Sequence, residues 1–146
     1  MAGPCGTITG YGYFIEFEET GAEINSQQTF GIRFNGDSQF EAFKLLYTAE
    51  YATQSDYKDG NSDIDADYYF LELGGSVKGI TAKVGFESLG GDDAFGFETP
   101  LATKHAFNGW ADKFLNTPTD GLEDLYVLVT GKLAGVKLLA VYHDFE

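Results

Sequence analysis

The stretch DYYFLELGGSVKGITAKVGFESLGG, residues 67–91, decides the fold class of this chain. Apolar side chains recur at every second position on both sides of Lys78-Gly79, a pair that suits a tight hairpin turn. The pattern predicts two antiparallel strands over about 66–77 and 80–88. Their apolar stripe consists of Tyr69, Leu71, Leu73, Ile80, Ala82, Val84 and Phe86. Such a stripe can face either a protein core or lipid, and the choice between them governs the function.

Other parts of the chain repeat this alternation. Further strands are expected over 7–18, 28–36 and 40–54, and as a pair within 122–145 that turns near 133–135. A helix over 40–54 is the alternative there, but its apolar residues fit a period of 2 better than 3.6. The fold class predicted is all-β, an antiparallel β-barrel or barrel-like meander of about 7–8 strands. The candidate eighth strand lies near 93–99.

Two long connections interrupt the strands. Residues 55–67 form an acidic loop, and a long insert occupies about 90–121. Within the insert, Thr99 and Pro100 match the first positions of a helix, which predicts a short helix over 99–115. Residues 1–146 are expected to form one barrel-type domain, because the length suits a single domain.

The charge balance limits the partners. The net charge is −14, from 9 Lys and Arg against 23 Asp and Glu, which disfavours nucleic acid as a partner. The single Cys5 allows no disulfide within the chain. No run of 18 apolar residues is present, so no transmembrane helix is expected. No signal peptide is visible, which suggests a mature chain, an engineered fragment or a cytosolic protein.

The strand faces differ in chemistry in a way that suggests a membrane barrel. Aromatic side chains near strand ends are typical of the girdles of outer-membrane barrels, and those assigned to apolar faces are Tyr11, Tyr13, Phe30, Phe34, Tyr51, Tyr68, Tyr69, Phe86 and Tyr142. The side chains expected to line a polar lumen are Glu16, Arg33, Lys44, Glu50, Glu72, Lys83 and Glu87. Several segments also reach the 9 to 11 residues that a tilted strand needs to cross a bilayer.

Three runs resemble the bacterial outer-membrane barrels of the alginate-export/porin-like family. They are LYTAEYATQSDYKDG with DADYYFLELG (46–74), GFESLGGDDAFGFETPLATKHAFNGWADKFLNTPTDGLEDLY (85–126) and GKLAGVKLLAVYHDF (131–145). The resemblance extends from about Thr7 to Phe145, and PLATKHAFNGWADKFL followed by GLEDLY is its most specific part. It implies an outer-membrane porin-like β-barrel for passive passage or export of solutes, embedded in the lipid bilayer and without catalysis. Family members are longer, so this chain resembles a later portion of one.

A different function remains open at this point. Seven strands leave two sheet edges with unpaired backbone groups, and such edges can pair with another copy. The alternative is therefore a self-assembling structural protein, extracellular or at the cell surface, that forms tubes, filaments or rings. Its partners would be other copies of itself, as a homo-oligomer or polymer.

The remaining candidate sites are few. Asp63, Asp65 and Asp67 alternate in the acidic loop and suggest a calcium site, although the spacing does not match a calcium-binding loop. His105, Trp110 and Phe114 are candidates for a plug or constriction, and Trp110 fits simple packing under the loop equally well. No catalytic motif is apparent, so the chain is not predicted to be an enzyme, and no cofactor other than calcium is expected.

Overall fold

The computed structural model describes residues 2–3, 5–101 and 113–146. The strands form one antiparallel sheet in which each strand pairs with the next along the chain. They are β1 (Ala2–Gly3), β2 (Gly6–Ile15), β3 (Gln27–Gln39), β4 (Lys44–Asp56), β5 (Asp65–Val77), β6 (Ile80–Leu89), β7 (Leu122–Leu133) and β8 (Val136–Phe145). One 3-10 turn, η1 (Glu23–Asn25), precedes β3. The prediction of a barrel-like antiparallel meander is confirmed, and the described sheet does not close on itself.

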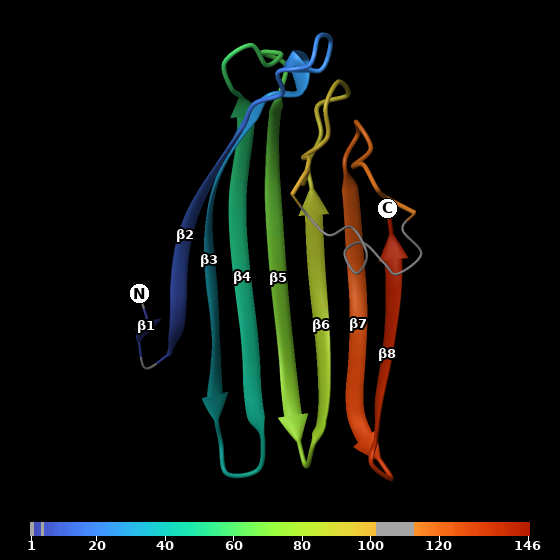
Figure 1. The fold of residues 1–146 in the computed structure, drawn as a ribbon. Coiled ribbons are helices and arrows are strands. Elements are labelled where there is room, and N and C mark those ends of the chain that lie inside the picture. The colour runs from blue at the N-terminus through green and yellow to red at the C-terminus, as the bar shows by residue number, and fades with distance from the viewer. Residues whose placement is uncertain (1, 4, 102–112) are drawn as a thin grey trace.

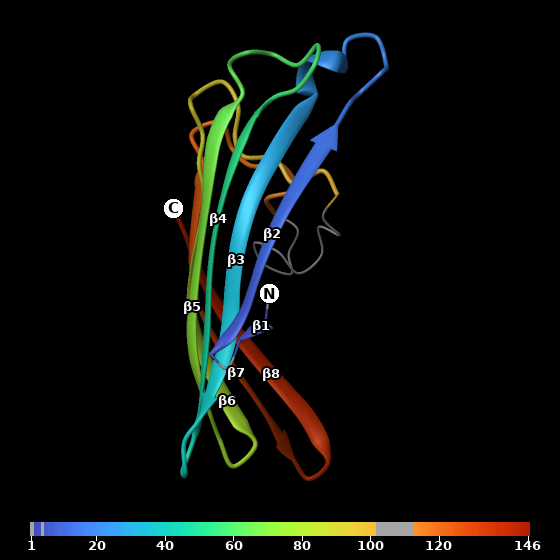
Figure 2. The same ribbon diagram turned by 90° about the vertical axis from the view of Figure 1, so that its left-hand side faces the viewer.

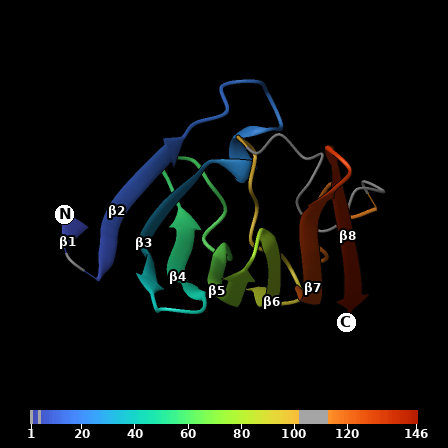
Figure 3. The same ribbon diagram turned by 90° about the horizontal axis from the view of Figure 1, so that it is seen from below.

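The sheet is curved, with β2 and β8 near its opposite edges (Figure 1). Seen from below, the strands follow a trough, and the described parts of the β6–β7 segment, residues 90–121, lie over its concave side (Figures 2 and 3). The three long connections gather at one end of the sheet and the short turns at the other (Figure 1). These ends are called the long-loop end and the turn end below. The described part of the chain has no helix with the length and apolarity needed to span a bilayer.

Strand register sorts the side chains onto two faces, because residues directly opposite each other in a sheet share a face. The concave, polar face carries Tyr11, Arg33, Glu50, Tyr68, Glu72, Lys83, Glu87, Asp124, Tyr126 and His143. The other, apolar face carries Ile8, Phe14, Phe30, Ile32, Tyr51, Tyr69, Leu71, Leu73, Val84, Leu125, Val127, Val129, Leu138 and Tyr142. The sheet is therefore amphipathic across its whole width.

The turn end is built from short, well-defined connections. Lys78-Gly79 and Ala134-Gly135 each join two strands with positive φ at both residues, 49° and 83° in the first and 50° and 84° in the second. These angles are those of the type I′ turn, whose twist matches a hairpin. Between β3 and β4 the rings of Phe40 and Phe43 stack with centroids 4.7 Å apart.

Several predicted boundaries differ from the structure. The strand expected over 7–18 ends at Ile15, and the segment 93–99 is not a strand but contributes one isolated bridge between Gly91 and Gly96. The bridge closes a compact loop. A Cβ at Gly91 or at Gly96 would overlap the carbonyl oxygen of Thr119 or of Pro118, so this loop packs closely against 117–119 and does not extend as a strand. Most of the helix expected over 99–115 falls outside the described residues.

The small apolar core lies at the long-loop end of the polar face. Ala52, Ala66, Leu89, Phe97 and Leu122 are buried there, where the β6–β7 segment packs on the sheet. The chain exposes 9424 Å² in all, whereas a compact monomer of this mass is expected to expose only about 7,400 Å². The excess reflects an apolar face that nothing in this chain covers within the described residues.

The β7–β8 turn generates a stability prediction. Ala134 has φ of 50°, which costs an alanine roughly 1 kcal/mol, whereas asparagine tolerates this region. Ala134→Asn is expected to raise the free energy of unfolding by about 1 kcal/mol, measured by urea titration of the protein in detergent micelles. Ala134→Val is the opposing variant, because a β-branched residue is poorly tolerated at positive φ. A stability order of Val above Asn would contradict the turn assignment.

Candidate functional site

The centre of the polar face is a group of charges and phenols on β2, β3 and β4. Arg33 forms an ion pair with Glu50, its direct cross-strand neighbour. The Tyr11 hydroxyl donates a hydrogen bond of 2.7 Å to Oε1 of the same carboxylate. The Arg33 guanidinium also lies over the Phe70 ring, 5.5 Å from its centroid, which is a favourable cation–π distance. Glu50 thus joins three strands through charge-assisted contacts.

A second group continues the network across β5, β6 and β7. Glu72 accepts a hydrogen bond of 2.9 Å from Lys83 Nζ and one of 2.6 Å from the Tyr126 hydroxyl. The Tyr68 hydroxyl donates to Glu87 Oε1 at 2.7 Å. Phenol donors and carboxylate acceptors therefore alternate across the trough. This arrangement satisfies polar groups that would be costly to leave unpaired on a partly buried surface.

Two glycines give the tyrosines their positions. A Cβ at Gly31 would overlap the ring of Tyr11, and a Cβ at Gly85 would overlap the ring of Tyr126. Each tyrosine therefore lies flat across a glycine on the neighbouring strand, and its hydroxyl reaches a carboxylate farther along. The side-chain network depends on these two close approaches.

The β6–β7 segment is fastened to the polar face by Gln54. This side chain is 1% exposed and donates hydrogen bonds to Thr29 Oγ1 at 2.8 Å and to the Glu98 carbonyl at 2.9 Å. It also accepts one of 2.8 Å from the Glu98 amide. Next to this clamp, Phe97 stacks on Tyr68 with centroids 5.3 Å apart. The segment is thus held against the concave side of the sheet.

The base of the same segment is a tight turn. Asp92 accepts hydrogen bonds from the amides of Phe95 at 2.8 Å and Ala94 at 3.0 Å. These donors favour the charged carboxylate and lower the pKa of Asp92. Farther along the segment, the Thr117 hydroxyl donates a hydrogen bond of 2.6 Å to the Phe97 carbonyl.

A cleft of about 430 Å³ lies between the polar face and residues 97–101. Its wall includes the Tyr11, Tyr13 and Tyr68 side chains from the sheet and Phe97 from the β6–β7 segment. Arg33, Glu50 and Glu87 contribute the charges of the sheet wall. Its volume lies within the range of small-molecule sites, and its lining combines aromatic surface with a few polar groups.

His143 has a partner that the sequence pattern does not reveal. Its Nδ1 lies 2.8 Å from Oδ2 of Asp124, which is 1% exposed. The adjacent Asp144 belongs to the opposite face, as alternation requires. His143 and Asp124 are 19 residues apart in the sequence, and only the β7–β8 register brings them together.

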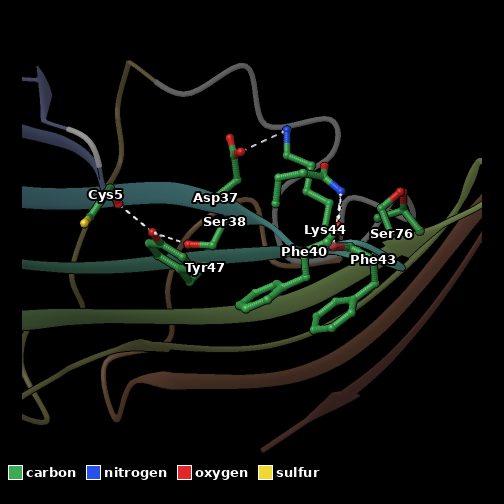
Figure 4. Close-up of polar contacts among 10 residues, drawn as sticks. Cys5, Asp37, Ser38, Phe40, Phe43, Lys44, Tyr47 and Ser76 are labelled. Carbon is green, nitrogen blue, oxygen red and sulfur yellow. Dashed lines mark hydrogen bonds and ion pairs between the residues drawn. The ribbon is translucent and has the colours of Figure 1, made fainter.

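The structure places most of the predicted polar residues together. Six share the polar face: Arg33, Lys44, Glu50, Glu72, Lys83 and Glu87. Lys44 lies near the turn end, with its Nζ 3.1 Å from Asp37 Oδ2. This ion pair is on the side opposite the rings of Phe40 and Phe43 (Figure 4). Glu16 follows the end of β2 and is ion-paired with Lys58 of the β4–β5 loop. The hydrogen bond between Lys58 and Glu16 raises the pKa of Lys58.

Three aromatic assignments from the sequence are wrong. Tyr11, Tyr13 and Tyr68 lie on the polar face, not on the apolar one. The residue type alone misled the assignment, because the phenol hydroxyls of Tyr11 and Tyr68 bond to carboxylates of that face. The other aromatics assigned to apolar faces lie there: Phe30, Phe34, Tyr51, Tyr69, Phe86 and Tyr142.

The other candidates are dispersed. Asp67 accepts a hydrogen bond of 2.8 Å from the Tyr51 hydroxyl, while the Asp63 amide donates to Asn61. Within residues 2–3, 5–101 and 113–146, no three His, Cys, Asp or Glu side chains are grouped to hold a metal ion. His105 and Trp110 lie outside the described residues. Phe114 packs against Phe145 with ring centroids 4.9 Å apart.

Comparison with known proteins adds no assignment. No family model, no curated protein and no solved structure matches this chain. The resemblance to alginate-export/porin-like barrels stays a prediction, and the site must be interpreted from its own geometry.

The tyrosine–glycine contacts generate a prediction for the site. Gly85→Ala is expected to displace the Tyr126 ring, break its bond to Glu72 and lower the free energy of unfolding, by about 1–3 kcal/mol as for overpacked sites. Urea titration in micelles measures the effect. The matched control is Gly75→Ala on β5, where a Cβ meets nothing within 4 Å. Equal destabilisation by both variants would contradict the proposed role of the close approach.

Proposed function

We propose that this chain forms the wall of a porin-like β-barrel of the outer-membrane type, which passes polar solutes without catalysis. The apolar face contacts lipid and the polar face lines the lumen. The observation that carries the proposal is the distribution of charge. On strands β2–β8, the apolar face has charged residues only near the long-loop end, at Asp65, Asp67, Glu123 and Asp144.

The exposure of the apolar face supports contact with lipid. Leu71 is 58% exposed, Leu73 54% and Val84 46%, and they are neighbours on β5 and β6. Water-soluble monomers rarely expose contiguous apolar patches beyond a few hundred Å². A surface of this kind extending across seven strands is stable only when hydrocarbon or protein covers it.

The dimensions of the sheet also suit a bilayer. Strands β2–β8 are 10 to 13 residues long, against about 9–11 needed by a tilted membrane strand. Near the long-loop end, Phe14 contacts Phe30, and Tyr51 contacts Tyr69, with ring centroids 5.4 Å and 5.1 Å apart. The stacked rings of Phe40 and Phe43 lie at the turn end (Figure 4). Aromatics at both ends of an aliphatic band are typical of membrane interfaces.

The polar face has the chemistry of a lumen wall. Arg33 pairs with Glu50 and Lys83 pairs with Glu72. The Tyr11 and Tyr68 hydroxyls donate hydrogen bonds to Glu50 and Glu87. Such a surface is stable in contact with water and presents both signs of charge to a passing solute. With a net charge of −14, the chain is poorly suited to polyanions, so its solutes are proposed to be small and neutral or cationic.

Placement in a bilayer generates a prediction with a matched pair of variants. Leu71→Lys puts a charge on the apolar face, and Thr48→Lys puts the same charge on the polar face in the neighbouring strand. Leu71→Lys is expected to oppose insertion by about 2–4 kcal/mol, while Thr48→Lys inserts like wild type. Vesicle flotation, heat-modifiable migration and stepwise conductance in planar bilayers measure the outcome. Equal insertion of both variants, or no conductance from wild type, would overturn the proposal.

Self-assembly remains the second candidate, because the described sheet does not close on itself. Among the described residues, Gly6 and Thr7 of β2 pair with β1. The seven long strands alternate in direction, so β2 and β8 run the same way. Two copies of equal orientation would therefore join through a parallel β8–β2 pair. Uniform tubes or rings in electron micrographs of detergent-free protein would favour this candidate over a pore.

A further inference from the structure

The β7–β8 hairpin changes character toward the turn end. Three cross-strand pairs continue its polar-face row there: Leu128–Val141, Thr130–Leu139 and Lys132–Lys137. Leu139 is 51% exposed although it lies in this row. On the apolar face of the same tip, Leu133 is 69% exposed and Val136 59%. The turn half of this hairpin is therefore apolar on both faces, and its charges are the lysines next to the turn.

Three lysines gather at this corner of the sheet. Lys132 lies directly opposite Lys137, and like charges in such a cross-strand pair repel each other. Lys78 belongs to the adjacent β5–β6 turn, because a Cβ at Gly131 would meet the Gly79 carbonyl at 3.7 Å. All three lysine side chains are exposed. The two neighbouring turns therefore present a positively charged tip above an apolar surface.

No neighbouring carboxylate offsets this charge. Residues 73–86 and 125–143 contain no Asp or Glu. Within the described part of the chain, none of the three lysines forms an ion pair. Asp37 and Glu41 lie on the β3–β4 side of the turn end, and Asp37 already has a lysine partner. At the long-loop end, by contrast, residues 16–26 carry four Glu and no Lys or Arg. The two ends of the sheet thus differ in the sign of their charge.

We propose that the turn end binds the phosphate headgroups of anionic phospholipid through Lys78, Lys132 and Lys137. The proposal rests on the lipid contact proposed above and names the class of lipid that this end selects. With the apolar tip against acyl chains, the flexible lysine stems carry their ammonium groups to the level of the headgroups. A phosphate between Lys132 and Lys137 also relieves their mutual repulsion. The acidic long-loop end repels the same headgroups.

Binding is tested on the whole chain in detergent micelles, which requires no bilayer. Phosphatidylglycerol and phosphatidylcholine, each in mixed micelles, are titrated by isothermal titration calorimetry. Saturable binding of phosphatidylglycerol alone is expected. Lys78→Gln, Lys132→Gln and Lys137→Gln are each expected to weaken the binding constant about 5-fold. Lys132→Arg keeps the charge and is expected to bind like wild type.

Lys58→Gln is the matched control, because it removes the same charge at the long-loop end. It is expected to bind phosphatidylglycerol like wild type. Equal binding of the two lipids, or equal weakening by Lys58→Gln, would overturn the headgroup site. Release of the lipid by inorganic phosphate, but not by chloride at equal ionic strength, would also overturn it, since the occupant would then be free phosphate.

Vesicle insertion and headgroup binding fail separately. Phosphatidylglycerol binding in micelles without insertion of the wild-type chain into vesicles would refute the membrane wall and leave the headgroup site standing. Insertion into vesicles without preferential phosphatidylglycerol binding in micelles would refute the headgroup site alone.

Discussion

The register between β4 and β5 is the constraint on which the rest of the structure depends. It places Thr48 opposite Glu72 on the polar face and Ala49 opposite Leu71 on the apolar face. A slip of one residue would exchange the two faces of a strand and put Glu72 among leucines. The cation–π contact of Arg33 with Phe70 and the continuity of the apolar band from β4 to β5 both require this alignment. The network therefore specifies the register as well as stabilising the sheet.

Much of the fold follows from local sequence. The strands around Lys78-Gly79 are predicted to within one residue, because a type I′ turn and alternating side chains leave few other pairings. The same alternation places Glu72, Lys83 and Glu87 on one face. The site is less accessible to such reasoning, since Gln54 contacts Glu98 across 44 residues and His143 meets Asp124 only in the observed register.

The aromatic residues show where residue type misleads. Tyr69 and Tyr68 are adjacent in sequence, yet Tyr69 contacts Tyr51 on the apolar face and Tyr68 bonds to Glu87 in the trough. A phenol combines an apolar ring with a polar hydroxyl, so tyrosine suits a membrane interface and a polar wall equally well. Only the strand register separates the two roles. This also explains why the cleft, which is lined by three tyrosines, was not predicted.

The central claim is that the apolar face lies against lipid and the polar face against water. Nitroxide labels placed singly at positions 69 to 73 of β5, in a Cys5→Ser background, test it most directly. In lipid vesicles, the account predicts strong collision with dissolved oxygen at 69, 71 and 73, and with a water-soluble nickel complex at 70 and 72. Labels at 69, 71 and 73 that are shielded from oxygen, or that behave identically in lipid-free buffer, would contradict it.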